Sequence, residues 1–114
     1  MEPQLQFYLF GPFAVWRCGE RLPAAVWRTR KHAALLKILL GERGRTVPAD
    51  RLIEWLWPDL SPHSGQANLY VGISLLRRVL EPALQTPADS SYILTRYPGY
   101  VFDASSDCWV DVGQ

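Results

Sequence analysis

The side chains of this chain that could do chemistry are mainly basic, and they are unevenly distributed. Residues 1–58 contain nine Lys or Arg against five Asp or Glu, residues 59–80 contain two against one, and residues 81–114 contain one against five. The formal charge of these parts is therefore +4, +1 and −4, although the whole chain carries only +1. An anionic partner is expected to approach the basic part of the chain.

Residue types that serve catalysis or metal binding are scattered. His32 and His63 have no carboxylate or second histidine at helical spacing, which favours a solvated or capping role. Cys18 and Cys108 are 90 positions apart, which disfavours a zinc site or a disulfide framework. The chain contains no nucleophile elbow, zinc-protease motif or phosphate-binding loop. We therefore expect neither enzyme activity nor a cofactor.

The composition fits one packed domain, because 48% of the 114 residues are hydrophobic. No basic signal-peptide segment precedes the first apolar stretch, and the longest apolar run, residues 33–40, is far shorter than the roughly 20 residues that span a bilayer. We expect a soluble, cytoplasmic protein with no membrane partner. The five tryptophans alternate with Leu and Val, so we assign them to the core or its edge.

The first quarter of the chain predicts a small antiparallel sheet. Aromatic and β-branched residues lie on both sides of Gly11 and Pro12, which is typical of two strands joined by a turn. The expected strands are residues 4–10, 13–17, 21–22 and 25–27.

Three helices are predicted next. Thr29 supplies an N-cap hydroxyl for the first helix, and Pro48 suits the first turn of the second, which Pro58 ends. Ser61, followed by a proline, opens the third helix, which runs to about Leu80.

The third helix has two different faces. At 100° per residue, its apolar residues Leu69, Ile73, Leu76 and Leu80 fall within an arc of about 60°, as in a helix that buries one stripe. Gly72 interrupts it at a cost of about 1 kcal/mol relative to alanine. Either something approaches closely there, such as a DNA backbone or another helix, or the cost is tolerated, and we favour the second interpretation. The opposite face consists of Ser64, Ala67, Asn68, Val71, Ser74, Leu75 and Arg78, flanked by Tyr70 and Arg77.

The last third predicts a hairpin. Residues 91–95 and 100–103 have strand character and are joined by a turn over residues 96–99. Residues 104–114 are small and acidic, so we expect a solvated linker toward a missing downstream domain rather than a cation site.

This order of elements is that of an α+β winged helix-turn-helix, with an N-terminal antiparallel sheet, three helices and a C-terminal hairpin as the wing. In such domains the last helix enters the major groove, and the wing reaches phosphates or the adjacent minor groove. We therefore expect residues 1–103 to form a DNA-binding domain, with helix 62–80 as recognition helix and hairpin 91–103 as wing.

The sequence resembles the OmpR/PhoB-type winged helix at the N-terminus of bacterial antibiotic regulatory proteins and related transcriptional activators. The matching stretches cover nearly the whole chain and are LFGPFAV, TRKHAALLKILL, RLIEWLWPD, ANLYVGISLLRRVLEP and TRYPGYVF, with WVDV at the end. The resemblance implies sequence-specific binding of double-stranded DNA, with RNA polymerase and a second copy of the chain as further partners. The residues that match the family's DNA-contacting positions are Arg30, Lys31, Asn68, Arg77, Arg78 and Arg96. From the open face of the third helix and its flank we add Tyr70, Val71, Ser74 and Leu75 as expected DNA contacts.

The sequence departs from the family's pattern in two places. Related recognition helices usually carry basic residues where this one has Tyr70 and Leu75, and the wing strand has Val101 where OmpR-type domains often have Arg. Because an arginine–guanine pair contributes about 1–3 kcal/mol of discrimination, direct readout is expected to be weak here. Val71 and Leu75 would contact thymine methyls and Asn68 would pair with adenine, which predicts an A·T-leaning site. The alternative is a winged helix that uses its apolar surface residues to bind a protein or to dimerise.

Overall fold

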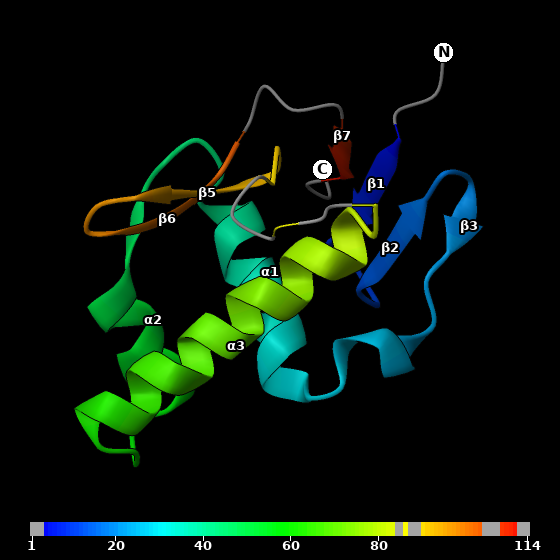
Figure 1. Cartoon of the computed structure of the whole chain (residues 1–114). Coiled ribbons are helices and arrows are strands. Elements are labelled where there is room, and N and C mark those ends of the chain that lie inside the picture. Colours follow the sequence, from blue (N-terminus) through cyan, green and yellow to red (C-terminus); the bar gives the residue numbers. More distant parts are fainter. Residues whose placement is uncertain (1–3, 84–85, 87–89, 104–107, 112–114) are drawn as a thin grey trace.

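The structure is a computed structural model that describes residues 4–83, 86, 90–103 and 108–111 (Figure 1). In these ranges the α-helices occupy the centre, with a four-stranded sheet on one side and a three-stranded sheet on the other (Figure 1). This is the α+β winged helix-turn-helix that the sequence predicts.

The four-stranded sheet consists of β1 (Leu5–Tyr8), β2 (Ala14–Arg17), β3 (Glu20–Arg21) and β7 (Cys108–Asp111), in the order β3-β2-β1-β7. The antiparallel pairing of the first three strands confirms the predicted sheet. β7, however, pairs in parallel with β1. The expectation of a linker is therefore wrong for residues 108–111, because Cys108 and Val110 pack against the core while the backbone joins the sheet. The rest of the predicted linker, residues 104–107 and 112–114, lies outside the described residues.

The strand predicted at residues 25–27 is instead a 3₁₀ helix, η1 (Ala24–Trp27). Two hydrogen bonds between residues three positions apart form it: the Val26 amide donates to the Pro23 carbonyl oxygen, and the Arg28 amide donates to the Ala25 carbonyl oxygen. The turn folds the Trp27 side chain into the core, where 7% of it is exposed.

Helix α1 (Arg30–Gly41) begins as predicted, because the Thr29 hydroxyl accepts a hydrogen bond from the His32 amide at 3.1 Å. His32, for which a solvated or capping role was expected, is half-buried and contributes its backbone amide to this cap. The imidazole Nδ1 of His32 lies 3.1 Å from the Trp27 carbonyl oxygen, which joins α1 to η1. Four leucines of α1 are buried and make it the central helix of the core, namely Leu35, Leu36, Leu39 and Leu40.

The helix-turn-helix consists of α2 (Ala49–Leu56) and α3 (Pro62–Leu80). Pro48 occupies the N-cap position of α2 rather than its first turn, and the Ser61 hydroxyl caps α3 by accepting from the Ser64 amide at 3.3 Å. At the other end of α3, the Arg17 guanidinium of β2 donates to the Val79 carbonyl oxygen. Helix α3 is thus held at both ends.

Gly72 marks a close approach of α1 to α3, so its interpretation as a tolerated cost is wrong. A Cβ at Gly72 would lie 3.0 Å from Leu35 Cδ2 and 3.1 Å from His32 Cδ2. The absence of a side chain therefore lets the start of α1 pack against the middle of α3.

The second sheet forms the wing and has the order β4-β6-β5. Its strands are β4 (Val47–Pro48), β5 (Ile93–Arg96) and β6 (Gly99–Phe102). β5 and β6 make the predicted hairpin with shifted boundaries. β4, which directly precedes α2, pairs with β6. The wing is therefore joined directly to the helix-turn-helix.

The predicted apolar stripe of α3 is the buried one, with Leu69, Ile73, Leu76 and Leu80 each no more than 3% exposed.

The tryptophans divide differently from the prediction. Trp27 and Trp57 are buried, whereas Trp55 and Trp109 keep 52% and 43% of their surface exposed, so the assignment to the core is wrong for the latter two. None of the helices in the described ranges has the length and apolar character that crossing a bilayer requires.

Candidate nucleic-acid interface

The face of α3 opposite the buried stripe is open to solvent. Tyr70 and Val71 are the most exposed large apolar side chains of this helix, at 70% and 55%. Ala67 and Arg78 are exposed beside them, while Ser74 is half-buried. The helical arithmetic thus located this face correctly, and it brings together apolar, hydroxyl and basic groups on one surface.

Asn68, expected to read a base, lies half-buried at the edge of this face. Its amide Nδ2 donates to the Ser64 carbonyl oxygen of the same helix at 3.0 Å. To pair with an adenine, the side chain would have to exchange this intrahelical hydrogen bond for one to the base.

A basic hollow borders one side of α3. Leu75 and Ser74 line it together with two arginines, Arg78 from the helix itself and Arg28 from the end of η1. The sequence did not indicate Arg28 as a site residue. The chain turns at Arg28 through a positive backbone φ of 63°, and such a turn has no clear sequence signal at an arginine. The one available signal was its position two residues before the Arg30–Lys31 pair.

Arg30 and Lys31 are exposed in the first turn of α1. Their neighbour His32 packs against Gly72, so this first turn lies beside the middle of α3. Helix N-termini add unpaired N–H groups that attract phosphate. The structure thus places Arg28 and Arg78 in one hollow beside α3, whose middle lies next to the first turn of α1.

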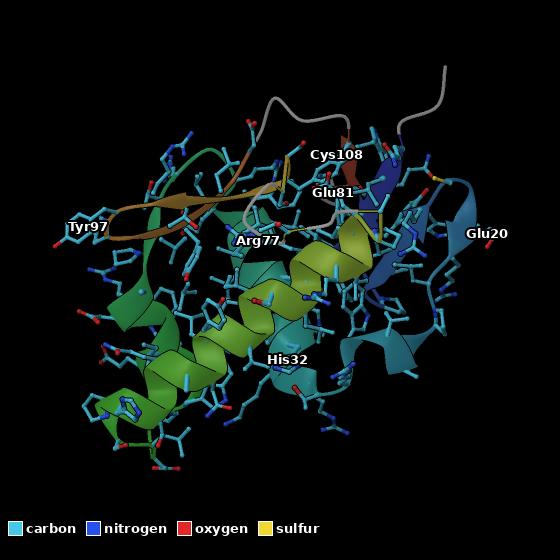
Figure 2. The ribbon with its side chains drawn as sticks, viewed as in Figure 1. Glu20, His32, Arg77, Glu81, Tyr97 and Cys108 are labelled. Carbon is cyan, nitrogen blue, oxygen red and sulfur yellow. The ribbon has the colours of Figure 1, made fainter. Side chains whose placement is uncertain are left out.

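Arg77, expected to contact DNA, is 6% exposed and is already bonded within the protein. Its Nε donates to the Ile93 carbonyl oxygen at 3.0 Å and its Nη2 to Thr95 Oγ1 at 2.9 Å, both on β5. Its guanidinium carbon lies 5.8 Å from the centre of the Tyr100 ring. Figure 2 shows it between α3 and the wing.

The prediction of a DNA contact is therefore wrong for Arg77, because its donors and charge are used to hold the wing. Burial lowers the pKa of Arg77 from its usual value, and the nearby phenol groups of Tyr100 and Tyr70 oppose that change. Replacement of its hydration shell by oriented acceptors and a ring makes the burial tolerable.

The wing ends in two exposed side chains, Arg96 and Tyr97. Among the described residues, Arg96 Nη1 donates to the carbonyl oxygen of its neighbour Thr95, at 3.3 Å, which leaves most of the guanidinium available. Tyr97, which sequence reasoning left without a role, is 99% exposed and lies at the free end of the hairpin (Figure 2).

The wing side of α3 differs from the basic side. A second hollow there is lined by His63, Tyr70 and Tyr100 together with Asp50 from the first turn of α2. A carboxylate repels a nearby anion, so the side of α3 next to Arg28 and Arg78 is the more favourable one for an anionic group. Within the described ranges no group of three or more His, Cys, Asp or Glu is placed to hold a metal ion.

Comparison with known proteins gives consistent matches. The family model described as "Transcriptional regulatory protein, C terminal" matches residues 23–102. Regulatory protein AfsR of Streptomyces coelicolor is 36% identical over 88 residues, which are 77% of this chain and 9% of that protein. Transcriptional regulatory protein EmbR of Mycobacterium tuberculosis is 34% identical over 80 residues, which are 70% of this chain and 20% of that protein. The chain therefore spans a fifth or less of the length of these relatives.

Solved structures agree. EmbR of Mycobacterium tuberculosis, in complex with a low-affinity phosphopeptide, superposes with a TM-score of 0.73 at 30% identity, covering 94% of this chain and 27% of that one. The response regulator DrrB of Thermotoga maritima, an OmpR/PhoB homologue, gives a TM-score of 0.63 at 26% identity, covering 85% of this chain and 44% of that one.

Proposed function

The chain belongs to the transcriptional regulatory protein C-terminal family, as a DNA-binding winged helix of the OmpR/PhoB type, and we propose that it binds double-stranded DNA sequence-specifically. In this proposal α3 lies in the major groove, and the wing contacts the adjacent backbone or minor groove. The family is one of regulators and not of enzymes.

One observation carries the proposal: the open face of α3 has basic groups on one side and a fixed wing on the other. Arg28 and Arg78 line the same hollow beside α3, and Arg77 bonds α3 to β5. A rigid helix between two backbone-contacting elements is the arrangement that positions a reading helix in a groove.

The contacts divide into two kinds. Phosphate contacts are assigned to exposed cations, and base contacts to the open face of α3, with Tyr70 at its edge. The proposed phosphate contacts are Arg28, Arg30, Lys31, Arg78 and Arg96. The proposed base contacts are Asn68, Val71, Ser74 and Leu75.

Selection from random duplexes tests the proposal, followed by fluorescence anisotropy at several salt concentrations. Five phosphate contacts predict that log K falls against log salt with a slope of about −4 to −5. The apolar groups Val71 and Leu75 predict an A·T-leaning motif. A slope near zero, or the recovery of no motif, would refute sequence-specific binding.

A second candidate function is supported by the exposure of Tyr70 and Val71, which together form an apolar surface on α3. In that case the surface would bind another protein or a second copy of the chain. A sedimentation coefficient that rises with concentration, together with no duplex binding at low salt, would favour this function over the first.

RNA polymerase is a further proposed partner of the DNA-bound chain. Trp55 on α2 and Leu60 in the turn after it are 52% and 41% exposed, and they offer apolar groups for such a contact. Loss of transcription with unchanged DNA binding in Trp55→Ala would support this contact.

A further inference from the structure

The tip of the wing presents an aromatic ring that the protein itself does not use. Arg96 and Gly99 are paired across the hairpin, which leaves only Tyr97 and Pro98 at its end. Tyr97 is 99% exposed, whereas Tyr92 is buried and Tyr100 is half-buried. An aromatic ring contributes little to folding when it stays in water, so this ring is available to an external partner.

The tip is held rigidly by the start of α2. The Ala49 amide donates to the Pro98 carbonyl oxygen at 3.0 Å, and Pro48 of β4 pairs with Gly99. The fit is so close that a Cβ at Gly99 would lie 1.8 Å from the Val47 carbonyl oxygen. Because these bonds join the tip to the helix-turn-helix, the backbone of Tyr97 is already positioned before any partner binds.

The surroundings of the ring indicate the chemistry of that partner. Arg96, the residue before it, is exposed and has most of its guanidinium available for a phosphate. Arg77 meanwhile bonds β5 to α3, which fixes the wing against the recognition helix. With α3 in a major groove, a wing fixed in this way points its tip at the neighbouring minor groove.

We propose that Tyr97 is a specificity-determining residue that enters this minor groove and selects A·T over G·C pairs there. Its ring would pack between the sugar walls while its hydroxyl donates to a base acceptor. The minor-groove floor of an A·T pair carries only acceptors, whereas guanine adds the N2 amino group, which is a donor and also obstructs the ring. This inference rests on the proposed function and adds a base-reading contact outside α3.

Inosine separates the minor groove from the major groove in a test. An inosine·cytosine pair has the major-groove groups of G·C but lacks the N2 amino group. The duplex recovered by selection is prepared with flanks of A·T, G·C or I·C pairs on both sides of its core. The unmodified chain and Tyr97→Ala are titrated against all three by anisotropy. The matched control is Phe10→Ala, which removes another exposed ring, at the turn after β1 on the other sheet.

The chain and the control should bind the A·T and I·C flanks at least about fivefold more tightly than the G·C flanks, the effect of one well-read base pair. Tyr97→Ala should bind all three alike, with its far-UV spectrum unchanged because the side chain is exposed. The inference is overturned if the chain binds the I·C flanks as weakly as the G·C flanks, or if Tyr97→Ala still binds the A·T and I·C flanks more tightly than the G·C flanks. Either result would leave DNA binding itself unaffected. No binding to any duplex overturns the proposed function as well.

Discussion

Arg77 Nη2 on α3 lies 2.9 Å from Thr95 Oγ1 on β5, so one buried side chain joins α3 to the wing. The adjacent residue, Arg78, is exposed and lines the basic hollow. Two consecutive arginines of one helix therefore have different roles. Arg77 fixes the position of the wing, whereas Arg78 is available to a partner in solvent.

Replacement of Arg77 by Met should destabilise the fold. The variant loses two hydrogen bonds from a charged donor and leaves the Ile93 carbonyl oxygen without that donor, which we expect to lower the free energy of unfolding by about 2–3 kcal/mol. Urea denaturation measures this change. A loss below about 0.5 kcal/mol would show that the buried bonds contribute little.

Arg78→Met is the matched control and should give the reverse pattern. Because the side chain is exposed, the free energy of unfolding should change by no more than about 0.5 kcal/mol. DNA affinity should fall, and the slope of log K against log salt should decrease in magnitude by about 0.9. An unchanged slope would remove Arg78 from the proposed phosphate contacts.

Arg28→Met tests the contact that the sequence did not indicate. It should also reduce the magnitude of the salt slope by about 0.9, because it removes one cation from the side of α3 that the start of α1 borders. Lys37→Met is its control, since Lys37 Nζ lies over the Phe13 ring at 5.0 Å, in a different hollow. Equal slopes for the two variants would contradict the assignment.

The sequence was sufficient for elements that local signals define. Thr29 and Ser61 cap their helices as predicted, and the spacing of Leu69 and Ile73 identifies the buried stripe. These features depend on residues within one or two turns of each other, which is why periodicity and capping rules find them.

Features made by distant residues were not predicted. β7 forms only because β1, about a hundred positions earlier, offers an edge to pair with. The role of Arg77 depends in the same way on acceptors of β5, 16 and 18 positions later. Helical arithmetic placed Arg77 beside the open face, but it could not show that the wing covers that flank.

Asn68→Ala should change specificity more than affinity. The variant keeps every proposed phosphate contact, so total affinity should fall only slightly, while discrimination for adenine at one position should drop by about 1–3 kcal/mol. Competition between duplexes with each base at that position measures the effect. A uniform loss on all sequences would mean that the amide serves only its bond to the Ser64 carbonyl oxygen.

Gly72→Ala should destabilise the chain although alanine is the better helix former. Helix propensity favours the variant by about 1 kcal/mol, but the new Cβ would lie 3.0 Å from the fully buried Leu35 and 3.1 Å from His32, whose ring lies against the Trp27 carbonyl oxygen. Overpacking of this kind costs about 1–3 kcal/mol, so we expect a net loss of about 1 kcal/mol in thermal or urea denaturation. Gly41→Ala is the control, because a Cβ at the end of α1 meets nothing within 4 Å and should leave the chain equally or more stable. If both variants were stabilised alike, α1 and α3 would not be closely packed at Gly72.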